Sequence, residues 1–242
     1  MHAHVHRILA IRSTRFLLVV FALSYVLLDV GWSFSTASSA IIMEGANHGA
    51  DTACVFLGVF GAVSVSGAAS QGAIALEILA FPNRLRVLVS RLLVNAVCAA
   101  VSSGAAFLAS YGAVTLILMA RHVHVENPGL AVFLLRFLAV MLIAVLYTSI
   151  GTGLGFLTES TAGSVAAFLG LILGLPMLST LAGLINGKVF QFLLACTPVS
   201  LTSSIMSGFG AKWIIGVAGL LAWGVAAMMF GWLRFRRYVP CQ

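Results

Sequence analysis

The chain has 242 residues, of which 61% are hydrophobic and only 8% are charged, whereas roughly 25% of the residues of soluble proteins are charged. This composition excludes a soluble fold and predicts an all-α protein that crosses the membrane several times. The formal net charge is +7, but the basic residues lie at the ends of apolar runs, so we do not expect nucleic acid as a partner.

Six apolar runs are long enough to cross the bilayer, which takes about 20 residues of helix. They are residues 16–34, 52–71, 92–119, 130–157, 163–185 and 213–232. We expect a single membrane domain over residues 1–242, with an amphipathic lead-in at residues 1–15 and a basic tail at residues 233–242.

Basic residues predict the orientation of these runs. If the N-terminus is cytoplasmic, nine of the thirteen Lys and Arg residues lie inside, namely Arg7, Arg12, Arg15, Arg84, Arg86, Arg91, Arg234, Arg236 and Arg237. Only Arg121, Lys188 and Lys212 then lie outside. Such a bias places both termini of a multi-pass cell-membrane protein in the cytoplasm.

The second run cannot continue as one straight helix. A helix over residues 52–81 would be about 45 Å long at 1.5 Å per residue, against a hydrocarbon thickness of about 30 Å. We therefore expect a break near Gly72 and a short, largely apolar helix within residues 72–82 on the cytoplasmic side. The alternative is a helix that lies on the lipid surface, anchored by Arg84 and Arg86.

Residues 186–211 form a second irregular segment. Their two apolar stretches are too short to span, and Pro198 separates them. A seventh crossing here would place the basic tail outside, against the charge bias. We therefore predict two short re-entrant or interfacial helices on the outer face, before the sixth crossing.

Several chemical functions are disfavoured. The histidines fall in tails or loops, at His2, His4, His6, His48, His122 and His124, so neither an intramembrane Ser-His protease nor a bis-histidine cytochrome is expected. We predict no catalytic residue and no metal site. No phosphate-binding loop occurs, and Gly151 and Gly155 have the spacing of a helix-packing contact instead.

The sequence after the second run suggests a family. The residues Gly72-Ala73-Ile74, then Leu79-Ala80-Phe81-Pro82-Asn83-Arg84-Leu85-Arg86 and Arg91, resemble a motif of permease subunits of the type-2 ABC exporter family. The six runs, the short outer helices and the basic tail resemble that family's layout as well. Ala68 and Ser70 stand where the family carries a glutamate and an arginine.

This resemblance implies an exporter of drugs, peptides or lipid-like molecules. Two permease subunits, identical or homologous, would sit on two separate ATPase subunits that hold ATP and Mg, so this chain needs no cofactor of its own. The ATPase-coupling residues would be Gln71, Ile74, Leu76, Glu77, Ile78, Leu79, Arg84 and Arg86. The alternatives are a stand-alone channel or secondary transporter, and, less favoured, a membrane-embedded enzyme.

Small residues in the fifth run suggest a dimer contact. Ala166, Gly170 and Gly174 recur every four residues and so lie on one helix face, where small side chains permit close approach of another helix in lipid. The resemblance also implies that the first and fifth crossings lie near the dimer axis. Packing within one chain is an equal alternative.

Two charged residues lie inside apolar runs. Asp29 and Arg136 are each about six residues from the outer end of their runs, or roughly 9 Å deep at 1.5 Å per residue. Because an isolated charge in hydrocarbon is unfavourable, we predict that they form an ion pair between the first and fourth crossings. The alternative is that Arg136 extends to the interface and Asp29 faces a wet vestibule.

Overall fold

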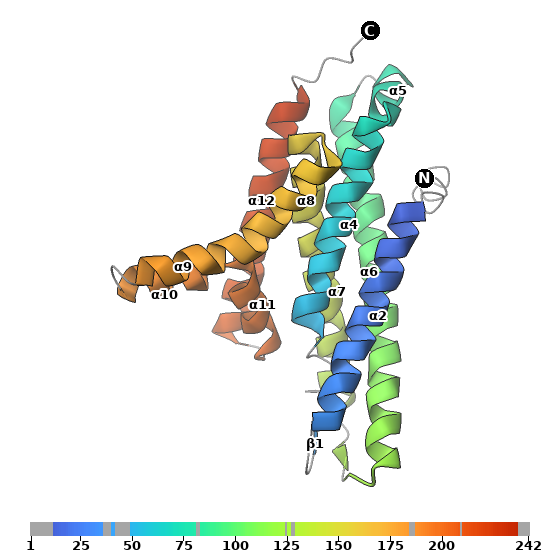
Figure 1. Ribbon diagram of the computed structural model, residues 1–242, viewed down its shortest axis with the longest axis vertical. Helices are drawn as coiled ribbons and strands as arrows, with labels where there is room; N and C mark the ends of the chain where they lie inside the picture. Colours follow the sequence, from blue (N-terminus) through green and yellow to red (C-terminus); the bar gives the residue numbers. More distant parts are fainter. Residues whose placement is uncertain are drawn as a thin grey trace.

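The computed structural model of the chain describes residues 12–35, 40–41, 49–80, 83–123, 125–126, 129–183, 187–208 and 210–236. Within these ranges the protein is helical apart from turns and a pair of two-residue strands (Figure 1). The helices are α2 (Arg12–Ser35), α4 (Ala50–Ser70), α5 (Ala73–Ala80), α6 (Arg84–Ala120), α7 (Leu130–Thr158), α8 (Thr161–Leu169), the π-helix η1 (Gly170–Gly174), α9 (Leu175–Gly183), α10 (Gly187–Ala195), α11 (Pro198–Met206) and α12 (Ala211–Arg236).

The expectation of an all-α protein with several membrane crossings is confirmed. Within the described ranges, five helical segments are long and apolar enough to span, namely Phe16–Phe34, Arg84–Ala120, Leu130–Thr158, Thr161–Leu181 and Ala211–Arg236. The second run of the sequence corresponds to α4, whose apolar segment Cys54–Ser70 is shorter. The structure thus supports five crossings by length and composition rather than the expected six.

The long helices form a bundle around α7. Figure 1 shows α2, α4, α6, α7 and α12 running along the long axis of the molecule. α7 packs against α4, α12 and α6, while α2 packs against α4 and α6. One end of the bundle carries α5 and the C-terminal end of α12, and we call it the α5 end.

Glycines bring α7 into backbone contact with its neighbours. A Cβ atom added to Gly151 would lie 1.9 Å from the carbonyl oxygen of Gly58 on α4, and one added to Gly155 would lie 2.7 Å from that of Ala62. On another side of α7, a Cβ at Gly153 would lie 2.5 Å from the carbonyl carbon of Ala227 on α12. The packing interpretation of Gly151 and Gly155 therefore agrees with the structure.

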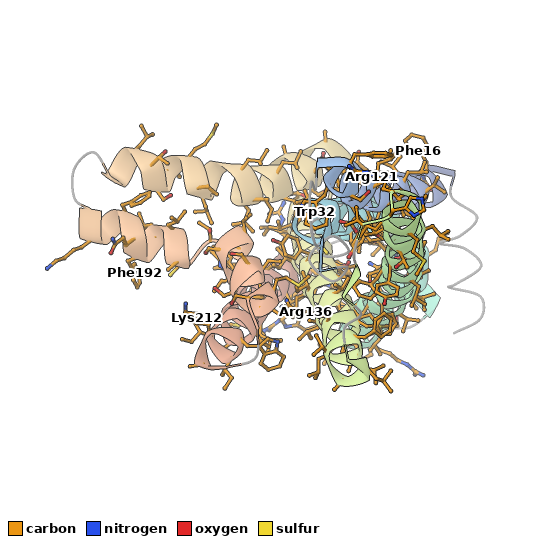
Figure 2. All side chains as sticks on the ribbon, turned by 90° about the horizontal axis from the view of Figure 1, so that it is seen from below. Phe16, Trp32, Arg121, Arg136, Phe192 and Lys212 are labelled. Atoms are coloured by element: carbon orange, nitrogen blue, oxygen red, sulfur yellow. The ribbon has the colours of Figure 1, made fainter. Side chains whose placement is uncertain are left out.

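The fifth apolar run bends instead of forming one straight helix. α8 packs in the bundle, and α9 then leaves it and projects sideways together with the antiparallel α10 (Figures 1 and 2). The five-residue π-helix η1 lies at the bend and ends two residues before Pro176. Because proline lacks an N–H and its ring collides with the carbonyl of residue i−4, it disrupts an α-helix at this point.

Short helices occupy both irregular segments of the sequence. α5 lies after Gly72, and α10 and α11 lie within residues 186–211. Side chains cap the starts of α6 and α11. The Asn83 side chain accepts a hydrogen bond from the Arg86 N–H at the start of α6, and Thr197 caps α11, whose first residue is Pro198. Side-chain caps and a proline at the first position are typical of helix starts.

Candidate functional site: the α5 helix and the buried polar residues

A left-handed turn separates α5 from α4. Gly72 has a φ of +70°, a conformation that glycine adopts without steric strain. After this turn α5 runs for eight residues at the α5 end of the bundle. Its Ile74 side chain is buried in a small core at that end, together with Val65, Ala68, Val87, Leu88, Phe156 and Phe235. The turn therefore fixes one end of α5 and the core fixes its inner face.

A buried ion pair ties α5 to α6. Arg91 donates from Nε to Oε2 of Glu77 at 3.0 Å and from Nη2 to Oε1 at 2.7 Å. Both side chains are more than 90% buried. Glu77 therefore points toward α6, which corrects the expectation that it faces an ATPase. Such bidentate contacts fix the orientation of both groups as well as their distance.

The remaining coupling residues differ in exposure. The Leu76 side chain is 62% exposed, and Gln71 and Arg86 are exposed as well. Arg84 instead donates from Nη1 to the carbonyl oxygens of Phe235 and Arg236, at 3.2 and 2.6 Å. Among the coupling side chains that the structure describes, Leu76 is the exposed apolar one.

Some predicted positions lie outside the described residues. These are the side chains of Ile78 and Leu79, residues 1–11 of the lead-in, residues 237–242 of the tail, and His2, His4, His6, His48 and His124. Within the described ranges, no group of three or more His, Cys, Asp or Glu side chains could hold a metal ion.

The structure places Asp29 away from Arg136, so the predicted ion pair is wrong. Asp29 is fully buried on α2. Its Oδ1 accepts the N–H of Gly49 at the start of α4, and its Oδ2 accepts the hydroxyl of Ser110 on α6. Arg136 lies half-buried on α7, well apart from Trp32 and Phe16 of α2 in Figure 2. Equal depth permits contact only between neighbouring helices, and α2 packs on α4 and α6 rather than on α7.

These contacts make Asp29 a bridge between three helices. We expect Asp29→Ala to lower the free energy of unfolding by about 2 kcal/mol or more, because it leaves a buried N–H and a buried hydroxyl without their acceptor. Thermal unfolding in detergent measures this loss. The effects of Asp29→Ala and Ser110→Ala should be strongly non-additive, whereas those of Asp29→Ala and Arg136→Gln should add. Additive effects for the first pair would contradict the bridge.

A second group of buried, hydrogen-bonded polar side chains lies inside the bundle, and we did not predict it from the sequence. Asn95 on α6 is 1% exposed, and its Nδ2 donates to Ser64 Oγ on α4 at 2.7 Å and to Thr152 Oγ1 on α7 at 3.1 Å. Its Oδ1 has no hydrogen-bond partner. The sequence does contain an indication of this group, because Asn95 is the single side-chain amide in the third apolar run. Polar residues inside membrane helices usually bind another helix or have a functional role.

The small-residue stripe of the fifth run is open. Ala166 and Gly170 are exposed and Gly174 is half-buried. A Cβ atom added to Gly170 or Gly174 would have no described atom within 4 Å. Packing within the described part of the chain therefore does not account for the stripe, which also extends across the bend at η1.

Comparison of the chain with protein-family models and with curated proteins finds no match.

Proposed function

We propose that this chain is the membrane-spanning permease subunit of an ATP-driven exporter. The observation that carries the proposal is the position of α5. This short helix at the end of the bundle buries Ile74 in the core and leaves Leu76 exposed. A permease that is moved by a separate ATPase needs a cytoplasmic helix that the ATPase can contact. That helix must be packed firmly on the membrane helices, because otherwise the movement of the ATPase would not reach them. The bound ATP and Mg belong to the partner in this proposal.

The attachment of α5 gives a route for the movement. The Glu77–Arg91 pair joins α5 directly to α6, and α6 continues for 37 residues through the bundle. A displacement of α5 is therefore passed to α6 through two charge-assisted hydrogen bonds. The same helix contributes Asn95 to the contact among α4, α6 and α7.

We propose that α4 also crosses the membrane, so that α2, α4, α6, α7 and α12 all cross along the bundle, while α9 leaves the bundle sideways. The 21 residues of α4 correspond to about 31 Å at 1.5 Å per residue, which matches a hydrocarbon thickness of about 30 Å. The α5 end would face the cytoplasm of a cell-membrane protein, because basic residues gather there, at Arg84, Arg86, Arg91, Arg234 and Arg236.

A second permease copy, identical or homologous, completes the proposed transporter. The stripe of Ala166, Gly170 and Gly174 is open at the point where α8 bends into α9, and it offers a surface for close helix approach. The translocated molecule would be a drug, a peptide or a lipid-like compound, as the resemblance to type-2 ABC exporter permeases implies.

The decisive experiment is co-purification from the protein's own host. The tagged full-length chain, extracted in mild detergent, should bring down a protein with ATP-hydrolysing activity. Leu76→Asp should reduce the recovered activity by about tenfold or more, because it replaces a leucine side chain at the contact by a charge. An ATPase-free eluate from the unchanged chain would instead favour a stand-alone channel or secondary transporter.

Leu233→Asp is the matched control. Leu233 lies near the end of α12 at the α5 end and is 53% exposed, so the same substitution there changes the charge but not α5. The two variants should unfold at similar temperatures. Equal loss of the ATPase from both variants would show that α5 is not the contact.

A further inference from the structure

An apolar groove runs along the bundle between α6 and α12. It has a volume of about 570 Å³, and its walls come from α6 and α12 and its floor from α7. The lining side chains are almost all apolar and include Leu92, Ala96, Leu146, Val225, Met228 and Trp232. α12 packs closely on α7 and touches α6 much less, which leaves the space between the two walls open.

A glycine lets α12 approach the floor of the groove closely. Gly224 on α12 lies against Ser149 on α7, where an added Cβ atom would be 2.8 Å from the Ser149 hydroxyl. α12 therefore approaches the floor of the groove without a side chain between them. The Ser149 hydroxyl donates to the carbonyl of Leu146 on its own helix, so it presents little polarity to an occupant.

Arginines stand at the α5 end of the groove. Arg84 reaches across from α6 to the last carbonyls of α12, at Phe235 and Arg236. The groove-lining residues of α12 include Val225, Met228 and Trp232, and helical spacing places Arg236 next on the same face. The Arg236 side chain is exposed.

The acidic residues near this mouth are already engaged. Among the described residues at the α5 end, Glu77 is paired with Arg91, and Glu159 lies 3.8 Å from Arg234. Arg84 uses Nη1 for both of its carbonyl contacts, so its guanidinium still has N–H groups for an anion. The mouth therefore combines an apolar channel with an excess of positive charge.

We propose that this groove binds an anionic phospholipid, with one acyl chain along α6 and α12 and the headgroup phosphate at Arg84 and Arg236. An apolar lining accepts an acyl chain, and guanidinium groups bind phosphate oxygens through charge-assisted hydrogen bonds. Trp232 lies in the groove one helical turn before Arg236, and tryptophan is favoured at the boundary between acyl chains and headgroups. The site does not depend on the proposed ATPase partner.

The test is lipid binding to the purified full-length chain. After delipidation in detergent, the protein is titrated with phosphatidylglycerol and with phosphatidylcholine of identical acyl chains, and bound lipid is counted by native mass spectrometry. We expect a preference for phosphatidylglycerol, and we expect Arg236→Gln to reduce that preference about fivefold, the effect of one basic residue near an anionic headgroup. Lys212→Gln, which removes a charge from the other end of α12, should leave it unchanged.

A second pair of variants tests the apolar part. Val225→Trp, at a position 56% exposed in the groove, should weaken the binding of both lipids alike by about tenfold, because it fills the space for the acyl chain. Val101→Trp, at a position 65% exposed on α6 and outside the groove, should have no effect. Unchanged thermal unfolding shows that the variants are folded. Equal affinity for the two lipids, or equal behaviour within either pair of variants, would overturn the proposal.

Discussion

Gly151→Ala is expected to prevent the bundle from forming its native contact between α4 and α7. The added methyl group would lie 1.9 Å from the carbonyl oxygen of Gly58 and 3.0 Å from the backbone nitrogen of Ala62. Because both are backbone atoms, no side-chain rotation relieves the collision, and the helices have to separate. We expect a loss of more than about 3 kcal/mol in the free energy of unfolding.

Thermal unfolding of the detergent-solubilised protein measures this effect. Gly112→Ala is the matched control, because Gly112 is also a helical glycine but an added Cβ there meets nothing within 4 Å. That substitution should leave the protein as stable or make it more stable by about 0.5–1 kcal/mol. Similar unfolding temperatures for the two variants would mean that α4 and α7 do not approach through Gly151.

Removing one partner of the Glu77–Arg91 pair should have the second large effect. In Glu77→Gln, Arg91 keeps its charge at a buried position, and breaking such a pair costs about 3–5 kcal/mol. The double variant Glu77→Gln with Arg91→Gln removes both charges and should recover a large part of the loss. Thermal unfolding of the single and double variants gives the interaction free energy.

An exposed pair serves as the control for this measurement. Arg234 and Glu159 are 3.8 Å apart, and their side chains are 64% and 29% exposed. Glu159→Gln should therefore change the stability by no more than about 1 kcal/mol. If Glu77→Gln were as mild as Glu159→Gln, α5 would not be held to α6 by this contact, and the proposed route of movement would lose its support.

The positions of the helices could be predicted largely from the apolar runs. Long runs without charge predict membrane helices because the bilayer requires them. The break after α4 was predictable from length and from Gly72, and α5 lies at the expected place. The bend in the fifth run also had a signal, because Pro176 lies inside it and proline disrupts a helix.

The side-chain partners could not be predicted in the same way. Asp29 and Arg136 have similar depths in the sequence, but depth does not say which faces of two helices meet, and Asp29 bonds to Gly49 and Ser110 instead. Glu77 looked like an exposed residue of a cytoplasmic helix. Its partner Arg91 is fourteen residues away on the next helix, α6, so periodicity within a single helix does not indicate the contact.

The position of α7 between α4 and α12 has a consequence for the biogenesis of the protein. When α7 leaves the ribosome, α4 has already been made, so Gly151 can pack at once. Gly153 has to wait for α12, and translating the roughly 50 residues between Thr158 and Ala211 takes about 3–10 s. During that interval the face of α7 that α12 will cover has no partner helix. A ribosome that stalls before α12 therefore leaves an incompletely packed chain that quality-control proteases can recognise.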